Sequence, residues 1–138
     1  MSKQTKVVIG AGGVVKNSGV HDASIFEVVT KGEVDNISAL VRCRTEDGQT
    51  LIFRFEEVRF FNTLFYGPQN VVSDCIVLSG LDARSELSEI KDFELYTFEK
   101  IDRINDEIKK GELTLVRFIP SVGAAIDCLC RRIELEIG

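Results

Sequence analysis

The sequence predicts an α+β fold with a mainly antiparallel sheet of about seven strands and two or three short helices packed on it. Several segments alternate apolar and polar residues with the period of a strand, and one pair of them flanks an Asp-Gly turn. Most strands are joined by connections too short for crossover helices. The chain has 138 residues and contains no linker. We therefore expect a single domain spanning residues 1–138.

The N-terminal third is expected to contain two short strands separated by a glycine-rich loop. Residues 6–9 are mostly apolar, and residues 25–30 are rich in β-branched and aromatic side chains. The stretch 10–19 holds four glycines, which is typical of a loop or turn.

The clearest local pattern lies in residues 36–56. Apolar and polar residues alternate on both sides of Asp47-Gly48, a pair that tolerates the positive φ of a tight turn. We predict an antiparallel hairpin with one apolar face and one face partly covered by arginines.

Residues 56–66 change period and predict a two-turn helix that Gly67-Pro68 ends. A strand would place aromatic residues on both of its faces, whereas a helical wheel gathers the apolar residues on one side. The residues on that side are Val58, Phe60, Phe61, Leu64 and Phe65.

Four further strands and two further helices are expected in the second half. The helix at 82–90 would be capped by Asp82 and the helix at 98–110 by Thr97, because short oxygen-bearing side chains satisfy the first N–H groups. The strands are expected at 71–78, 93–97, 113–119 (ended by Pro120) and 125–137. Alternation places Val72 and Cys75 on opposite faces of the first of these strands, and Leu129 and Leu135 on one face of the last.

The charge of the chain argues against nucleic acid as a partner. The net charge is −5 and the pI is about 5.0, whereas nucleic-acid-binding proteins usually carry a basic stripe. The whole excess lies in residues 71–138, with fourteen acidic and nine basic residues. That half could steer a basic partner toward it, although a solvated face is the simpler interpretation.

The compartment is predicted to be the cytoplasm. No apolar run is long enough for a membrane span, and the run Val7-Val8-Ile9 is too short for a signal peptide. We therefore expect no membrane partner and four reduced thiols, because disulfides persist mainly in oxidising compartments.

The glycines at 10, 12 and 13 follow an apolar run, as in a dinucleotide-binding loop. Such a loop needs a third small residue and a helix that begins directly after it. Here position 15 is valine, and β-branched residues and turn formers stand where the helix should begin. We predict a glycine turn and no cofactor.

Cys128 and Cys130 are candidates for a metal or redox site, which Cys43, Cys75 and His21 could complete in three dimensions. In a strand the two thiols would project on one face, but structural zinc takes four ligands at other spacings. Simple burial is the preferred interpretation, so no metal is expected. The one histidine, His21, lies in a predicted loop without a catalytic motif, and no catalytic residue is assigned.

Two carboxylates within predicted strands are candidate polar anchors. Asp74 and Asp127 each precede a cysteine, and adjacent strand residues point to opposite faces. A buried carboxylate needs a partner. We assign Arg117 as the basic anchor. Five arginines in predicted strands could pair with these carboxylates: Arg42, Arg54, Arg117, Arg131 and Arg132.

The aromatic segment is the strongest interface candidate. Aromatic residues concentrate at binding hot spots and also in cores, so both roles stay open. The predicted interface residues are Phe60, Phe61, Leu64, Phe65 and Tyr66.

The hairpin followed by Phe55-Glu56-Glu57-Val58-Arg59-Phe60-Phe61 resembles small bacterial β-rich domains, over residues 36–78. Some of these domains serve as immunity proteins against partner toxins. The resemblance implies a protein partner and assigns no functional residue.

The leading hypothesis is a non-enzymatic domain that binds another protein or a second copy of itself. It depends on the aromatic segment, the acidic half and the missing catalytic motif. One alternative is a small-ligand-binding protein or small enzyme with a Phe-lined pocket. The other is a thiol-based metal or redox site at Cys128 and Cys130.

Overall fold

The computed structural model describes residues 3–16, 18–33, 36–90, 93 and 98–138. Within these ranges six long strands and two helices form the predicted α+β structure, and a three-residue strand brings the strand count to seven. The elements are β1 (Lys3–Thr5), the 3-10 turn η1 (Ala11–Gly13), β2 (Ser24–Glu33), β3 (Asn36–Arg44), β4 (Thr50–Leu64), β5 (Val71–Ser79), α1 (Gly80–Leu87), α2 (Phe98–Lys109), β6 (Thr114–Val122) and β7 (Ala125–Ile137).

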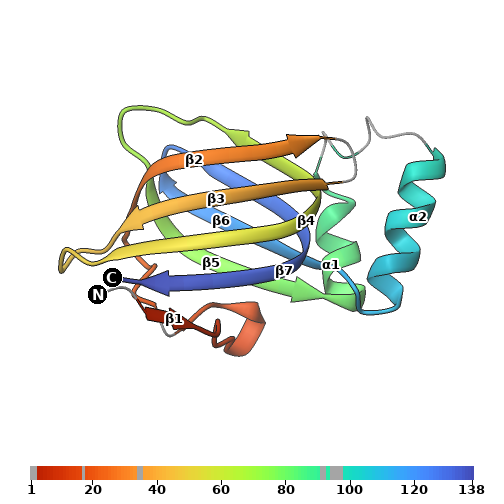
Figure 1. Ribbon diagram of the computed structural model, residues 1–138, viewed down its shortest axis with the longest axis horizontal. Coiled ribbons are helices and arrows are strands. Elements are labelled where there is room, and N and C mark those ends of the chain that lie inside the picture. Colours follow the sequence, from red (N-terminus) through yellow and green to blue (C-terminus); the bar gives the residue numbers. More distant parts are fainter. Residues whose placement is uncertain (1–2, 17, 34–35, 91–92, 94–97) are drawn as a thin grey trace.

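The sheet is antiparallel throughout and closes on itself. Its strand order is β1-β7-β4-β3-β2-β5-β6, and β6 pairs again with β7. β4 and β7 pair along almost their whole length, from Leu51↔Ile137 to Leu64↔Ala125. Both strands bend, so that the sheet forms two layers with the helices at one end (Figure 1).

The first hydrophobic core fills the space between the two layers. Its centre is three phenylalanines: the ring of Phe118 meets the rings of Phe53 and Phe55 edge-on, with centroids 5.2 and 6.4 Å apart. All three side chains are fully buried, and so are the four cysteines. Edge-to-face pairs add to the free energy that burial alone supplies.

A second core lies between the helices and the outer face of β4, β6 and β7. Ile104 and Ile108 of α2 and Leu87 of α1 cover Leu115 of β6 and Leu129 of β7. The three-four spacing of the apolar residues in α2 thus serves to cover the sheet, as predicted. Among the described residues, no helix is long and apolar enough to span a membrane.

The predicted hairpin is confirmed. β3 pairs with β4 from Ala39↔Phe55 to Arg44↔Thr50, and Gly48 in the turn has a φ of +89°. Thr45 holds the turn, because its Oγ1 accepts the N–H of Gln49 at 2.9 Å. Strands β2, β5 and β7 and helices α1 and α2 also occupy the predicted regions.

The helix predicted at 56–66 is wrong, because β4 continues to Leu64. Its pairing with β7 shifts register between Val58 and Phe60, so one extra residue stands in β4. The bulge turns Val58 toward the first core and Phe60 toward the second. Because both faces of β4 are covered, aromatic residues can lie on each side of this strand. The bulge gives the apolar residues a spacing similar to that of a helix.

Other predicted element boundaries also differ from those in the structure. The strand predicted at 6–9 is reduced to an isolated bridge at Ile9, whereas Lys3–Thr5 pairs with β7. Pro120 lies within β6 instead of ending it, at a register shift where the ladder tolerates a missing N–H. α1 begins after Ser79, with Asp82 in its first turn. The strand predicted at 93–97, apart from Phe93, and the Thr97 cap lie outside the described residues.

The predicted faces of β5 and β7 need correction. Bulges in β5 bring Val72 and Cys75 onto one face, although the alternation predicted opposite faces. In β7, Leu129 lies under the helices but Leu135 lies in the first core. Strict alternation predicts both residues on one face of β7, but the bend of the strand places them in different cores.

The phenylalanine cluster should dominate the stability of the first core. We expect Phe118→Ala to lower the free energy of unfolding by about 3–5 kcal/mol, because it leaves a cavity beside two rings. Urea unfolding followed by circular dichroism measures this change. Leu81→Ala on the exposed side of α1, where Leu81 is 81% accessible, is the control and should change stability by less than about 0.5 kcal/mol. Equal effects would contradict the assigned core.

Candidate binding groove

A cavity with a volume of about 780 Å³ opens between the two layers of the sheet. This volume lies within the usual range of ligand sites, roughly 300–1,000 Å³. Its walls come from β2, the start of β3 and the second half of β4. The apolar lining residues are Phe26, Val28, Ile37, Val58, Phe60, Phe61 and Tyr66, and the polar ones are Glu27, Thr30, Arg59 and Thr63.

The groove exists because strand pairing stops on both sides of it. β3 and β4 pair only as far as Ala39↔Phe55, after which β4 bends into the other layer. β2 pairs with β5 only at Ser24↔Val71. The two layers therefore separate between these points, and the first core is accessible from the groove through Val58 and Phe61.

One polar atom in the groove lining has no partner. Thr63 Oγ1 is buried and forms no hydrogen bond with any described residue. An unsatisfied buried hydroxyl typically costs about 1–3 kcal/mol. The two charged lining residues both form ion pairs. Glu27 Oε1 lies 2.6 Å from Arg42 Nε, and Arg59 Nε lies 3.4 Å from a carboxylate oxygen of Glu107.

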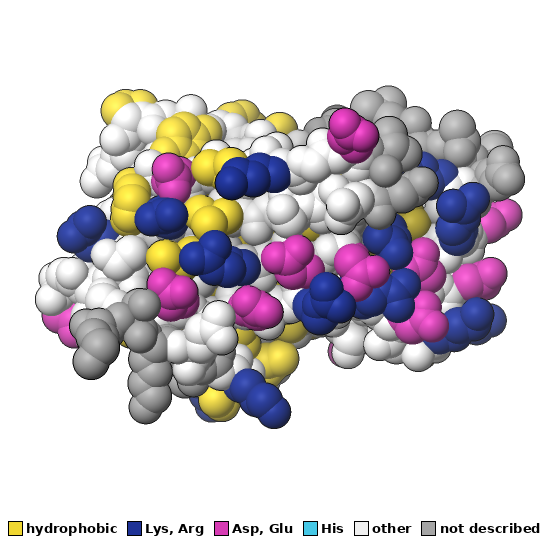
Figure 2. Space-filling model, in the orientation of Figure 1, with side chains coloured by type: hydrophobic (Ala, Val, Ile, Leu, Met, Phe, Trp, Pro, Cys, Tyr) yellow, Lys and Arg dark blue, Asp and Glu magenta, His cyan; other side chains and the backbone are white. Residues whose placement is uncertain are grey.

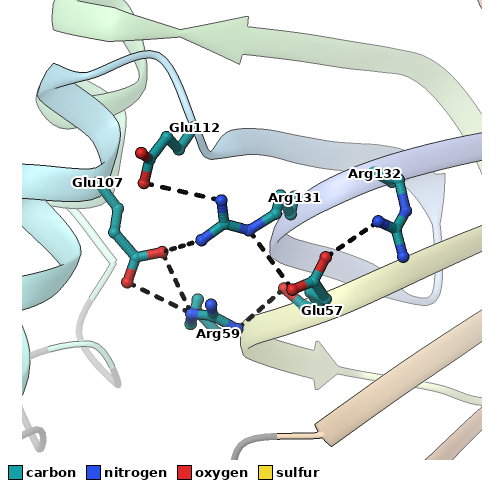
Figure 3. Close-up of polar contacts among 6 residues, drawn as sticks. All are labelled: Glu57, Arg59, Glu107, Glu112, Arg131 and Arg132. Atoms are coloured by element: carbon teal, nitrogen blue, oxygen red, sulfur yellow. Dashed lines mark hydrogen bonds and ion pairs between the residues drawn. The ribbon is translucent and has the colours of Figure 1, made fainter.

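An ionic network holds the groove wall to α2 (Figure 3). Glu107, largely buried, accepts from Arg131 Nη2 at 3.0 Å as well as facing Arg59. Arg131 in turn faces Glu57 and Glu112, at 3.6 and 3.7 Å. Charges shared among several partners form a network, which contributes more than isolated surface pairs do. The network thus fixes where Arg59 lies.

Glu57 stands at the bend of β4 and has a φ of +51°, which a non-glycine residue rarely adopts. Its carboxylate faces Arg131 and also Arg132, at 3.1 Å. We attribute the retention of this strained conformation to these contacts and to the pairing on either side of it.

The predicted interface residues are separated by the fold. Phe60 is buried under the helices against Phe93, and Phe61 is half-buried in the groove. Leu64, Phe65 and Tyr66 are exposed, with Phe65 80% accessible and at a φ of +62°. The core interpretation therefore holds for Phe60, whereas the exposed residues remain accessible to a partner.

The sequence did not indicate that Phe26 of β2 forms the wall of the groove opposite β4. Phe26 is the extra residue of a bulge in β2, half-exposed, with the Arg44 guanidinium 5.3 Å from its ring centre. An aromatic residue in an alternating strand was the only local signal. That Phe26 faces the same cavity as Phe61 depends on the bend of β4.

The candidate polar anchors do not form one site, and none lines the groove. Arg117 Nε lies 2.7 Å from Asp127 and Arg117 also bonds Glu86 of α1, so the expected salt bridge to a buried carboxylate is present. Asp74 is instead half-exposed, with His21 Nδ1 3.9 Å away.

Five of the fourteen acidic residues in the C-terminal half form ion pairs with arginines among the described residues. Glu86, Glu107, Glu112, Asp127 and Glu136 all take part in ion pairs. On the face shown in Figure 2, acidic and basic side chains are interspersed, and apolar side chains gather toward the end where β2 begins. The uneven charge along the sequence is therefore partly neutralised in space.

The glycine segment packs against β5 and is not followed by a helix. Val15 N–H donates to the Cys75 carbonyl at 2.9 Å. Gly13, at a φ of +82°, lies so close to β5 that a Cβ atom would be 2.7 Å from the Val77 carbonyl oxygen. Glycine is needed here for close packing between segments. The helix N-terminus that a dinucleotide site requires does not follow this loop.

The four thiols lie in the first core. Cys128 and Cys130 share a face of β7, as expected for a strand. Burial raises the pKa of the Cys43 thiol to about 12 and also raises the pKa of Cys75 and Cys128, which disfavours the reactive thiolate. Among described residues, no group of three or more His, Cys, Asp or Glu side chains could hold a metal ion.

His21 lies on the surface. Its side chain is 68% exposed, Nδ1 bonds the Ser73 carbonyl oxygen, and Nε2 lies 3.4 Å from Asp22. The hydrogen bond to Ser73 and the charge of Asp22 raise its pKa above 6.5. His21 is not among the residues that line the groove.

Comparison of the chain with protein families, curated proteins and solved structures finds no match.

The buried thiols should be inert in the folded protein. With an aromatic disulfide reagent at pH 8, we expect negligible reaction of native protein and four thiols after unfolding in urea. Absorbance of the released thiolate measures both. Rapid reaction of two native thiols would support a redox site at Cys128 and Cys130.

The histidine should titrate above its ordinary pKa. Because His21 is the only histidine, one imidazole resonance in a proton NMR titration reports it. We expect Asp22→Asn to lower this pKa. Because the folded pKa is raised, the interactions favour the folded state below about pH 6.5 and are lost as the pH rises through the folded pKa. A wild-type pKa below 6.5 would contradict the assigned contacts.

Proposed function

We propose that this protein is a binding domain without catalytic activity, and that the groove between β2 and β4 receives an apolar segment of another protein. The observation that carries the proposal is the groove itself, an aromatic-lined cavity of about 780 Å³ that opens on the first core. Aromatic side chains dominate the free energy of binding in many protein interfaces.

Exposed apolar side chains extend the groove onto the surface. Phe26 and Tyr66 belong to the lining, and Leu64 and Phe65 stand next to Tyr66 in the chain. Apolar residues gathered beside a cavity are typical of an interaction site. Both charged lining residues are held in ion pairs, which supports binding rather than proton transfer.

Residues 36–78 resemble small bacterial β-rich domains, some of which serve as immunity proteins, so a bacterial toxin is one candidate partner. A toxin gene adjacent to the gene for this chain would favour that partner. Four free cysteines support a reducing compartment such as the cytoplasm for this binding.

A small amphipathic ligand is the second candidate occupant. The buried Thr63 hydroxyl without a partner favours it, because a ligand with one polar atom and an apolar body would satisfy both parts of the lining. Mass spectrometry of molecules extracted from the purified protein would detect such a ligand.

Peptides selected from a displayed random library test the proposal. We expect them to bind wild-type protein and to lose at least tenfold in affinity to Phe61→Ala and Tyr66→Ala, measured by fluorescence anisotropy. Leu81→Ala removes a comparably exposed apolar side chain from α1 and should leave affinity unchanged. Failure to select any binder, or binding unaffected by both groove variants, would overturn the proposal.

A further inference from the structure

We propose that the bound segment is extended and adds a strand to the sheet along the unpaired edge of β2. This inference rests on the proposed function, because it concerns the form that the occupant takes in the same groove. It names the partner as a β-strand with apolar side chains at every second position.

The first observation is the free edge itself. β2 pairs with β3 from Ser24↔Arg44 to Glu33↔Asn36, whereas its other side meets β5 only at Ser24. Among described residues, no strand pairs with that side from Phe26 to Glu33. Such an edge presents backbone N–H and C=O groups that an extended segment can pair with.

Two features limit the usable length of this edge. The bulge at Phe26 disturbs the edge at one end, and Lys31 stands at the other, a residue type that discourages strand addition. Between them, Glu27–Thr30 spans roughly 13 Å, at about 3.3 Å per residue. A segment of four to six residues would therefore suffice to pair with it.

The second observation is that this edge borders the groove. Val28 and Thr30 of β2 line the cavity, and Val28 also packs against the first core. A strand added beside β2 continues the same layer, so its alternate side chains enter the cavity toward Phe61 and Thr63. The remaining side chains point to the outer face beside Val29 and Lys31.

Thr63 supplies an independent reason for an occupant. Its buried hydroxyl lines the cavity without a hydrogen-bond partner among the described residues. A polar atom on one inward side chain of the added strand would satisfy it. A helix could fill the cavity and reach Thr63, but it would leave the β2 edge unpaired because its own backbone groups are bonded internally.

An N-methyl scan of library-selected ten-residue peptides tests strand addition. Methylation removes one backbone N–H at a time, and we expect at least tenfold loss of affinity at alternate positions with little change at those between. Amide hydrogen exchange within Glu27–Thr30 should slow when peptide is bound. Thr63→Val should weaken binding of a peptide with an inward polar side chain, whereas Thr63→Ser should retain it.

The outcomes separate the two proposals. Peptides that respond to Phe61→Ala but show no alternation in the scan, or leave exchange in β2 unchanged, would overturn strand addition and leave groove binding standing. Peptide binding that neither Phe61→Ala nor Tyr66→Ala affects, or the absence of any binder, would overturn both. Light scattering tests the remaining case. A wild-type dimer that dissociates when peptide is added would show that a second copy occupies the groove, and would overturn another protein as the partner.

Discussion

The long pairing of β4 with β7 is the interaction on which the rest of the structure depends. Because the two strands stay bonded through their common bend, they belong to both layers of the sheet. The bend places β6 beside the first half of β7 and β1 beside its last residues. It closes the sheet around one core, and it separates the layers where the groove opens.

Charged residues gather at the bend. Glu57 and Arg59 of β4 and Arg131 of β7 stand together there (Figure 3). Glu107 of α2 joins them, so the helix that covers the second core is tied to the residue that borders the groove. The stability of the bend and the shape of the groove are therefore coupled through α2.

Local patterns were sufficient for much of the fold. The alternation around Asp47-Gly48 determines a hairpin because the turn and both strands are neighbours in the chain. The apolar stripe of α2 is likewise a periodicity within one element. The segment 56–66 misled because a bulge reproduced helical spacing, and only the covering of both its faces stabilises aromatic residues in a strand.

The sequence by itself determined the α+β class, the main hairpin, the two helices and the buried cysteines, since each depends on local periodicity or on composition. The tertiary structure alone decided the closure of the sheet, the pairing of Arg117 with Asp127 and Glu86, and the meeting of Phe26 with Phe61 at one cavity. These contacts join residues far apart in the chain. Their geometry is set by how two bent strands pair, which no local pattern specifies.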